Sequence, residues 1–234
     1  LGTGYWGLGI GLWLPAGSMS ASPSPWSLVP SPQSRYAGAM TQVLIIGAGH
    51  AGGSVAAFLR QYGFEGGIVL AGDEAAAPYQ RPPLSKAWLK GEAGEAGVED
   101  LLLRPESFYV EQAIDLRRGV TATAIDRAAR RVVFADGTVE NYDVLVLATG
   151  SISRRLSIPG IDLPGVMELR TLVEAEALKA RLAPGRRLVV IGGGFVGLEA
   201  AASARALGCE VTVLEREGRL LARVASEPIS HLLD

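Results

Sequence analysis

The sequence predicts an α/β fold in which one structural unit occurs twice. Gly-Ala-Gly-His-Ala-Gly at 47–52 follows the apolar residues 43–46, and Gly-Gly-Gly-Phe-Val-Gly at 192–197 follows the apolar residues 188–191. An apolar run that leads into such a loop is typical of a buried parallel strand followed by a helix. The composition agrees, because 48% of the 234 residues are hydrophobic and 30 are glycine.

Each glycine in these loops has a physical role. The first permits the tight turn out of the strand, the second lets the backbone approach a pyrophosphate, and the third lets the helix pack closely on the strand. The helix N-terminus then offers unpaired N–H groups to the phosphates. These positions are Gly47, Gly49 and Gly52 in the first unit and Gly192, Gly194 and Gly197 in the second.

The residues after the first loop continue this pattern. Residues 54–62 predict a helix with Gly63 as its C-cap, and residues 68–70 predict a strand that ends before Asp73 and Glu74. In dinucleotide-binding folds, an acid about 20 residues after the third glycine binds a ribose. The first unit therefore predicts a dinucleotide site.

The second unit repeats the order. Residues 198–207 predict a helix capped by Gly208, and residues 211–214 predict a strand that ends at Glu215. The alternative for each unit is an ordinary α/β segment whose glycines only form turns. Two units, each with a loop and an acid, favour two Rossmann-like dinucleotide-binding domains.

The residues between the loops predict a small antiparallel sheet. Residues 120–125, 131–134 and 139–142 alternate apolar and polar side chains, and Asp136-Gly137 supplies a hairpin turn. A buried strand at 143–147 follows and ends in Ala-Thr-Gly, whose small residues can approach a ligand.

A helix and a chain reversal lead to the second loop. Residues 171–182 carry Leu172, Ala175, Leu178 and Leu182 on one helical face, and Pro184-Gly185 ends the helix. We interpret residues 40–158 as the first dinucleotide domain, interrupted by a second one at 159–234. That second domain is expected to be incomplete, because a doubly wound unit needs a further strand and helix. We interpret residues 1–39 as a disordered or mis-annotated extension, with a targeting segment as the alternative.

The composition argues against several classes of protein. A net charge of −2 gives no reason to expect nucleic-acid binding, and the apolar part of residues 1–39 is too short to span a membrane. The single cysteine, Cys209, excludes an intrachain disulfide and suggests a reducing, cytoplasmic compartment. We expect Cys209 to be a small buried core residue and predict no metal site.

The motifs together resemble the two-dinucleotide flavoprotein reductases. The stretch Pro-Tyr-Gln-Arg-Pro-Pro-Leu-Ser-Lys at 78–86 and Gly-Gly-Gly-Phe-Val-Gly-Leu-Glu-Ala-Ala at 192–201 are similar to the ferredoxin and rubredoxin reductase branch. That branch includes reductase components of aromatic-ring dioxygenases and proteins like apoptosis-inducing factor. The resemblance covers residues 40–234 and implies an FAD domain interrupted by an inserted NAD(P)H domain, with the C-terminal part of the protein missing.

The cysteine content narrows the chemistry that this resemblance implies. Disulfide reductases carry a Cys-x-x-x-x-Cys pair shortly after the first acid, but no cysteine occurs there in this chain. A thiol relay is therefore excluded, since it requires a thiolate. The resemblance implies electron transfer from NAD(P)H through FAD to a ferredoxin- or rubredoxin-like acceptor, with no catalytic side chain required. The two histidines are His50, expected to be positional, and His231.

The resemblance also implies residue roles at the FAD site. Asp73, alone or together with Glu74, would bind the adenosine ribose; a solvated loop charge is the alternative for Glu74. Arg81 and Lys86 would contact the flavin, with surface charges as the alternative. Further FAD contacts are expected from Gly47, Gly49, His50, Ala51, Gly52, Ala122, Thr149, Gly150 and Arg170.

At the second site, Glu199 would contact the nicotinamide, with a first-turn acid favoured by the helix dipole as the alternative. Glu215 would bind the ribose and repel a 2′-phosphate, so NADH is favoured over NADPH, although Arg216 argues the other way. The phosphates would lie on Gly192, Gly193, Gly194, Phe195, Val196 and Gly197.

Two other functions remain open from the sequence. One is a non-catalytic nucleotide-binding fragment, because the family's second flavin-binding segment and interface domain are expected beyond residue 234. The other is the flavin subunit of an NADH oxidase or nitrite reductase, which is built on the same scaffold.

Overall fold

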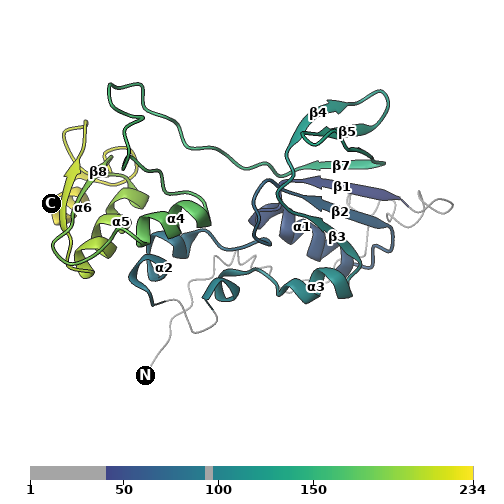
Figure 1. The fold of residues 1–234 in the computed structure, drawn as a ribbon, viewed down its shortest axis with the longest axis horizontal. Helices are drawn as coiled ribbons and strands as arrows, with labels where there is room; N and C mark the ends of the chain where they lie inside the picture. The colour runs from purple at the N-terminus through teal and green to yellow at the C-terminus, as the bar shows by residue number, and fades with distance from the viewer. Residues whose placement is uncertain (1–40, 93–96, 234) are drawn as a thin grey trace, which may run out of the picture. The chain divides into compact units, whose positions relative to one another are not determined.

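The computed structural model describes residues 41–92 and 97–233 (Figure 1). The interpretation of residues 1–39 as an extension lies outside these described residues. Among them, no helix is long and apolar enough to cross a membrane, and no cluster of three or more His, Cys, Asp or Glu side chains could hold a metal ion.

A four-stranded parallel sheet with the order β3-β2-β1-β7 forms the first unit. Its strands are β1 (Gln42–Ile46), β2 (Gly67–Ala71), β3 (Ile114–Arg117) and β7 (Val144–Leu147). The strands predicted at 43–46, 68–70 and 143–147 are confirmed. Strand β3 was missed, because it is only four residues long and lies at the edge of the sheet.

The central strands of this sheet are buried on both faces. On one face, Val43 and Ile45 of β1 pack with Ala56 of α1 (His50–Gln61) and with Tyr109 of α3 (Glu106–Glu111). Figure 1 shows α1 and α3 on this side of the sheet. On the other face, Leu44 and Ile46 pack against Val132 and Phe134 of β5 (Arg131–Phe134). The sheet therefore lies between a helical layer and a second sheet.

That second sheet is the antiparallel meander expected between the two loops. Its strands are β4 (Ala122–Asp126), β5 and β6 (Val139–Asn141), in that order. Gly137 has φ +84°, and Asp136 Oδ1 accepts a hydrogen bond of 2.9 Å from Thr138 N, so the predicted hairpin turn at Asp136-Gly137 is confirmed.

The second unit contains the parallel pair β8 (Arg187–Ile191) and β9 (Glu210–Leu214), joined by α5 (Phe195–Ala206). The short helix α6 (Glu227–Leu233) follows. The expected strand, loop, helix and strand are confirmed. Cys209 is 2% exposed, as expected for a small core residue.

Helix α4 (Leu172–Lys179) precedes β8 and has a complete capping box. The Thr171 side chain accepts from Glu174 N, and the Glu174 carboxylate accepts from Thr171 N. Leu172, Ala175 and Leu178 are buried, which confirms the predicted apolar face. The helix ends at Lys179, three residues before the predicted end at 182.

Two predictions about the glycine loops and their strands are wrong in detail. Helices α1 and α5 begin at His50 and Phe195, earlier than expected, because the loops themselves form the first helical turn, with Gly49 and Gly194 as N-caps in extended conformation. Strands β7 and β8 are not fully buried: Leu147 is 60% and Ile191 is 55% exposed. Among the described residues, no helix covers their outer faces.

The residues between β2 and β3 form short helical pieces that the sequence did not indicate: η3 (Pro82–Ser85), α2 (Ala87–Lys90) and η4 (Gly97–Leu101). Trp88 of α2 packs with Leu172 and Ala175 of α4, and Leu89 packs with Ala200 of α5. Residues 82–90 therefore lie against α4 and α5 of the second unit, whereas the boundary at 158/159 stays a prediction.

A single arginine, near the end of α1, forms hydrogen bonds with two loops. Arg60 Nε donates to Gln112 O at 2.7 Å, Nη2 donates to Ala113 O at 2.9 Å, and Nη1 donates to Phe64 O and Gly66 O at 2.6 and 2.8 Å. The guanidinium thus satisfies carbonyls that no helix or strand pairs. These residues precede β2 and β3, so Arg60 fixes the entry of both strands into the sheet.

We expect Arg60→Ala to lower the free energy of unfolding by about 2 kcal/mol, because charge-assisted hydrogen bonds to four carbonyls are lost. The measurement is urea denaturation at neutral pH. Arg118→Ala is the matched control: Arg118 makes one exposed ion pair with Glu106 at 2.6 Å, so its loss should cost less than about 0.5 kcal/mol. Equal losses in the two variants would contradict the role of Arg60.

Candidate dinucleotide-binding site

A cavity of about 920 Å³ opens at the carboxyl ends of β1, β2 and β7. Because β2 and β7 lie on opposite sides of β1, the chain diverges there, and ligands of α/β sheets bind at such a point. The lining brings together residues 47–51, 72–74 and 148–155 with Arg81, Glu168, Arg170, Thr171 and Glu174.

The first glycine loop has the geometry that the sequence predicted. Gly47 has φ +108°, and a Cβ there would overlap Ala148 O of the strand end beside it. A Cβ on Gly52 would overlap Gly47 O, so the third glycine is required for helix α1 to approach the loop. Gly49 differs, because a Cβ there would meet nothing within 4 Å. Its backbone borders open cavity, which is where a ligand could approach.

One end of the cavity suits a phosphate group. Helix α1 begins at the cavity with no acidic residue in its first turn and no side-chain cap, so its N-terminal N–H groups and positive dipole end are uncompensated. The charged side chains of the lining balance one another: it includes Arg81, Arg154, Arg155 and Arg170, and also Asp73, Glu74, Glu168 and Glu174. The start of α1 is therefore the part of the cavity that fits the pyrophosphate of a dinucleotide.

The two acids after β2 are in different environments. Glu74 Oε1 forms an ion pair with Arg81 Nη2, and Glu74 Oε2 accepts a hydrogen bond of 2.6 Å from Tyr79 Oη. Glu74 is therefore not a solvated loop charge. Asp73 lines the cavity and is exposed, and within the described ranges its carboxylate makes no hydrogen bond or ion pair. Asp73 is the carboxylate that is available to a ribose.

Sequence reasoning missed the residue at the centre of this contact network, Tyr79. Its hydroxyl also accepts from Leu172 N at 3.0 Å and from Arg81 Nη1 at 3.2 Å. Burial, with the hydrogen bond to Glu74 and its charge, raises the pKa of Tyr79 well above the ordinary value. The only sequence signal was its place in the stretch at 78–86.

Two residues that were assigned to different nucleotides meet in the structure. Lys86 Nζ lies 2.6 Å from Glu199 Oε2 of α5, and Ser85 Oγ donates to the same oxygen at 2.6 Å. Burial acts to raise the pKa of Glu199, but the hydrogen bonds from Lys86 and Ser85 outweigh it, so the pKa lies below its ordinary value. Neither residue lines the cavity, whereas Arg81 and Arg170 do.

A buried hydrogen bond reinforces this junction. Ser203 Oγ of α5 donates to Ser85 O at 2.8 Å. Three hydrogen bonds thus join helix α5, which starts at the second glycine loop, to the segment that carries Lys86. Helix α5 has no acid in its first turn, so Glu199 is not a first-turn acid. Lys86 is exposed, and both a flavin contact and a surface charge stay predictions for it.

The second glycine loop repeats the backbone geometry of the first. Gly192 has φ +108°, a Cβ on Gly197 would overlap Gly192 O, and a Cβ on Gly194 would meet nothing within 4 Å. Phe195 and Val196 open helix α5 and are more than half exposed, so the start of this helix is accessible.

The acid after β9 is fixed to that loop. Glu215 Oε2 accepts from Gly193 N at 2.6 Å, and Oε1 accepts from Glu217 N at 2.8 Å. These backbone hydrogen bonds, the one from Glu217 first, hold the pKa of Glu215 below its ordinary value. Gly193 O accepts a hydrogen bond from Leu221 N at 2.9 Å. Gly193 is therefore itself held in place, and its N–H orients the carboxylate of Glu215. The Arg216 side chain forms an ion pair with Glu217, in which Nη2 lies 2.8 Å from Oε1.

Of four further predicted residues, three line the cavity and one does not. His50 is exposed in the first turn of α1 and lines the cavity, as do Thr149 and Gly150. Ala122 lies in β4 and packs against the cluster beneath the sheet, outside the cavity lining. Its contact with adenine stays a prediction.

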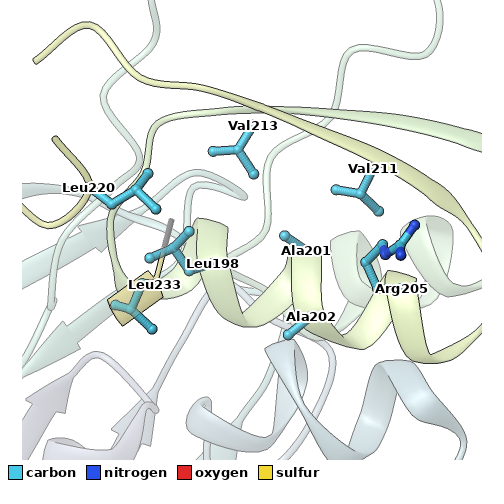
Figure 2. A pocket seen from close by; sticks show the side chains of 8 residues that line it. All are labelled: Leu198, Ala201, Ala202, Arg205, Val211, Val213, Leu220 and Leu233. Atoms are coloured by element: carbon cyan, nitrogen blue, oxygen red, sulfur yellow. The ribbon is translucent and has the colours of Figure 1, made fainter. Parts of the chain in front are cut away.

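A separate groove of about 600 Å³ lies on the second unit (Figure 2). Figure 2 shows Leu198, Ala201, Ala202 and Arg205 of α5 lining it together with Leu233, and the strand residues Val211 and Val213 lie above them. Apart from Arg205 its lining is apolar, and no glycine-loop backbone contributes. The groove lacks the polar groups that a dinucleotide requires.

We expect the free energy of unfolding of Glu199→Gln to decrease less steeply than that of the wild type as the pH is lowered. Because the pKa of Glu199 is lowered on folding, its stabilisation is present above the ordinary carboxyl pKa, about 4.3, and is lost as pH falls through the folded value. At neutral pH the variant should be less stable by about 1 kcal/mol or less, since the pair is partly solvated.

Urea denaturation between about pH 7 and about pH 3.5 measures this effect. Glu111→Gln is the control, because Glu111 is exposed and, in the part of the chain described, forms no ion pair or hydrogen bond through its side chain. A Glu199→Gln protein that loses stability in acid as steeply as the wild type would refute the assignment.

Comparison with known proteins agrees with this site. The family model described as pyridine nucleotide-disulphide oxidoreductase matches residues 41–234. A probable ferredoxin reductase, CtmF, of Castellaniella defragrans is 50% identical over 192 residues, which are 82% of this chain and 46% of that protein. This chain thus spans about half the length of the curated relatives it matches.

Solved structures give the same result. The ferredoxin reductase for the CYP199A2 system from Rhodopseudomonas palustris has a TM-score of 0.76 and 49% identity, covering 82% of this chain and 46% of that one. The covalent putidaredoxin reductase–putidaredoxin complex has a TM-score of 0.76 and 42% identity, covering 83% and 47%. This chain, with two glycine loops on an α/β fold, belongs to the pyridine nucleotide-disulphide oxidoreductase family, and relatives that it matches are ferredoxin and rubredoxin reductases.

Proposed function

We propose that this chain holds the nucleotide sites of a flavoprotein reductase that passes electrons from NADH through FAD to a ferredoxin-type iron–sulfur protein. The observation that carries the proposal is the junction of Lys86 with Glu199, since it joins the segment beside the first cavity to the helix that starts at the second glycine loop. Relatives named as ferredoxin and rubredoxin reductases support the same activity and partner.

The first cavity fits FAD. The glycine loop, with Gly47, Gly49, His50, Ala51 and Gly52, would hold the pyrophosphate at the start of α1. Asp73 would accept hydrogen bonds from the adenosine ribose. Arg81, Arg170, Thr149 and Gly150, on the other walls of the cavity, would face the flavin. FAD, when bound, accepts a hydride as two electrons and releases them one at a time.

The second loop fits NADH. Phe195 and Val196 would offer backbone N–H groups to the phosphates, and the fixed carboxylate of Glu215 would accept the ribose hydroxyls and repel a 2′-phosphate. Arg216 could favour NADPH, but its guanidinium is paired with Glu217. Glu199 would lie toward the nicotinamide end, with its charge balanced by Lys86.

Experiments distinguish two other functions from the proposed reductase. A nucleotide-binding module without activity would bind FAD and fail to oxidise NADH. An NADH oxidase would reduce oxygen without an iron–sulfur protein. We infer residues 40–158 and 159–234 as the two nucleotide domains, supported by one glycine loop in each.

We expect the purified chain to bind FAD and to be yellow, and Gly49→Ala to weaken FAD binding by about tenfold, because the added methyl group enters the cavity. Gly49→Ala should leave the urea unfolding midpoint unchanged. Gly52→Ala is the contrasting variant: its methyl group overlaps Gly47 O, so it should lower the unfolding free energy by about 3 kcal/mol. Calorimetric titration with FAD measures binding, and a wild-type chain that binds none refutes the FAD site.

The FAD-loaded chain should oxidise NADH faster than NADPH and reduce a ferredoxin under anaerobic conditions. Glu215→Gln should narrow the difference between the two nucleotides, because the carboxylate that repels the 2′-phosphate is removed. The measurement is the absorbance of the nucleotide with ferredoxin in excess. A loaded chain that leaves NADH intact identifies a binding module, and equal NADH consumption with oxygen alone identifies an oxidase.

A further inference from the structure

We propose that Tyr79 is a positioning residue of the FAD cavity: its hydroxyl holds the start of α4 against Glu74 and Arg81, and so fixes the wall that faces the flavin. This inference rests on the proposed function. Tyr79 does not line the cavity itself, so it acts through the three groups that it bonds.

The hydroxyl of Tyr79 uses its full hydrogen-bonding capacity. It donates to Glu74 Oε2 at 2.6 Å and accepts from Leu172 N at 3.0 Å and from Arg81 Nη1 at 3.2 Å. A phenol has one proton to donate and two lone pairs to accept with. The side chain is 3% exposed, so water cannot replace these partners at low cost.

Two of the three partners lie close to Tyr79 in the sequence, and the third lies 93 residues away. Glu74 follows β2, Arg81 precedes η3, and Leu172 is the first residue of α4. Glu74 and Arg81 line the cavity, as do Arg170 and Thr171 immediately before Leu172. The hydroxyl is therefore a single atom that sets the spacing between three cavity walls.

Arg81 extends the same contact to Arg170. Its Nη1 donates to Arg170 O at 2.8 Å, and its guanidinium carbon lies 5.3 Å from the centre of the Tyr79 ring. Arg81 is held by Glu74, Tyr79 and Arg170 together. The cation that Arg170 presents to the cavity consequently depends on a backbone position that the Tyr79 network fixes.

The hydrogen bonds of Tyr79 and Arg81 do not reach the part of the cavity that would hold the ADP half of FAD. Within the described part of the chain, the glycine loop and Asp73 form no hydrogen bond or ion pair with Tyr79, Arg81 or Leu172, and they are positioned by β1, β2 and α1. Loss of the hydroxyl should therefore affect the flavin half of FAD and spare the ADP half.

The chain supplies a matched control in Tyr109. This residue is also a buried tyrosine, 2% exposed, but its hydroxyl has no hydrogen-bond partner in the part of the chain that is described. Tyr79→Phe and Tyr109→Phe delete the same atom from equally buried rings. Only the first deletes contacts with cavity-lining residues.

The experiment compares the affinities of the wild type and both variants for FAD and for ADP by calorimetric titration. We expect Tyr79→Phe to raise the Kd for FAD about tenfold, to change the Kd for ADP less than about twofold, and to shift the absorption spectrum of the bound flavin. Tyr109→Phe should change none of these. Equal weakening of FAD and ADP binding, or unaltered FAD binding, would overturn the proposal.

Amide hydrogen exchange separates a failure of this inference from a failure of the proposed function. Exchange at Leu172 should accelerate in Tyr79→Phe and not in Tyr109→Phe, because Leu172 N loses its acceptor. A wild-type chain that binds no FAD would refute the proposed function and, with it, the role of Tyr79 toward FAD. Unchanged exchange at Leu172 would refute the role of Tyr79 at the start of α4 whether or not FAD binds.

Discussion

The close approach of a helix to the loop that precedes it is the constraint on which this structure depends. Gly52 of α1 lies so near Gly47 O that no side chain fits between them, and Gly197 of α5 lies in the same relation to Gly192 O. This approach aims the first turn of each helix across the end of its strand. The open backbone at Gly49 and Gly194 is a consequence, since the tight contact at the third glycine leaves the second one facing outward.

The two glycine loops share a backbone conformation, but their first position requires glycine for different reasons. Gly47 is enclosed by the strand end at Ala148, so both its φ of +108° and its surroundings demand glycine. Gly192 has the same φ, but a Cβ there would meet nothing within 4 Å. Backbone conformation alone requires glycine at the second loop. This difference follows from the sheets, because β7 borders the first loop and β8 pairs only with β9 among the described strands.

In the proposed function, each nucleotide site binds a ribose through the acid that follows the second strand of its unit. At the first site Glu74 is bound to Arg81 and Tyr79, which leaves Asp73 available. At the second site Glu215 is fixed by backbone N–H groups, which occupy one position on each oxygen and keep the carboxylate charged. Lys86 and Glu199 form a partly solvated ion pair between the segment at 82–90 and helix α5.

The sequence by itself determined the α/β fold, the two loops, the hairpin at Asp136-Gly137 and the family, because glycine spacing and apolar periodicity are local and each has one favourable backbone solution. It did not determine β3, the short helices at 82–101 or the partners of Tyr79, because these depend on contacts between residues distant in the chain. Only the tertiary structure decided that Glu74 forms an ion pair with Arg81 and that Lys86 forms one with Glu199. A carboxylate has the same sequence signature whether it binds a ribose or an arginine, and its neighbours in space decide which.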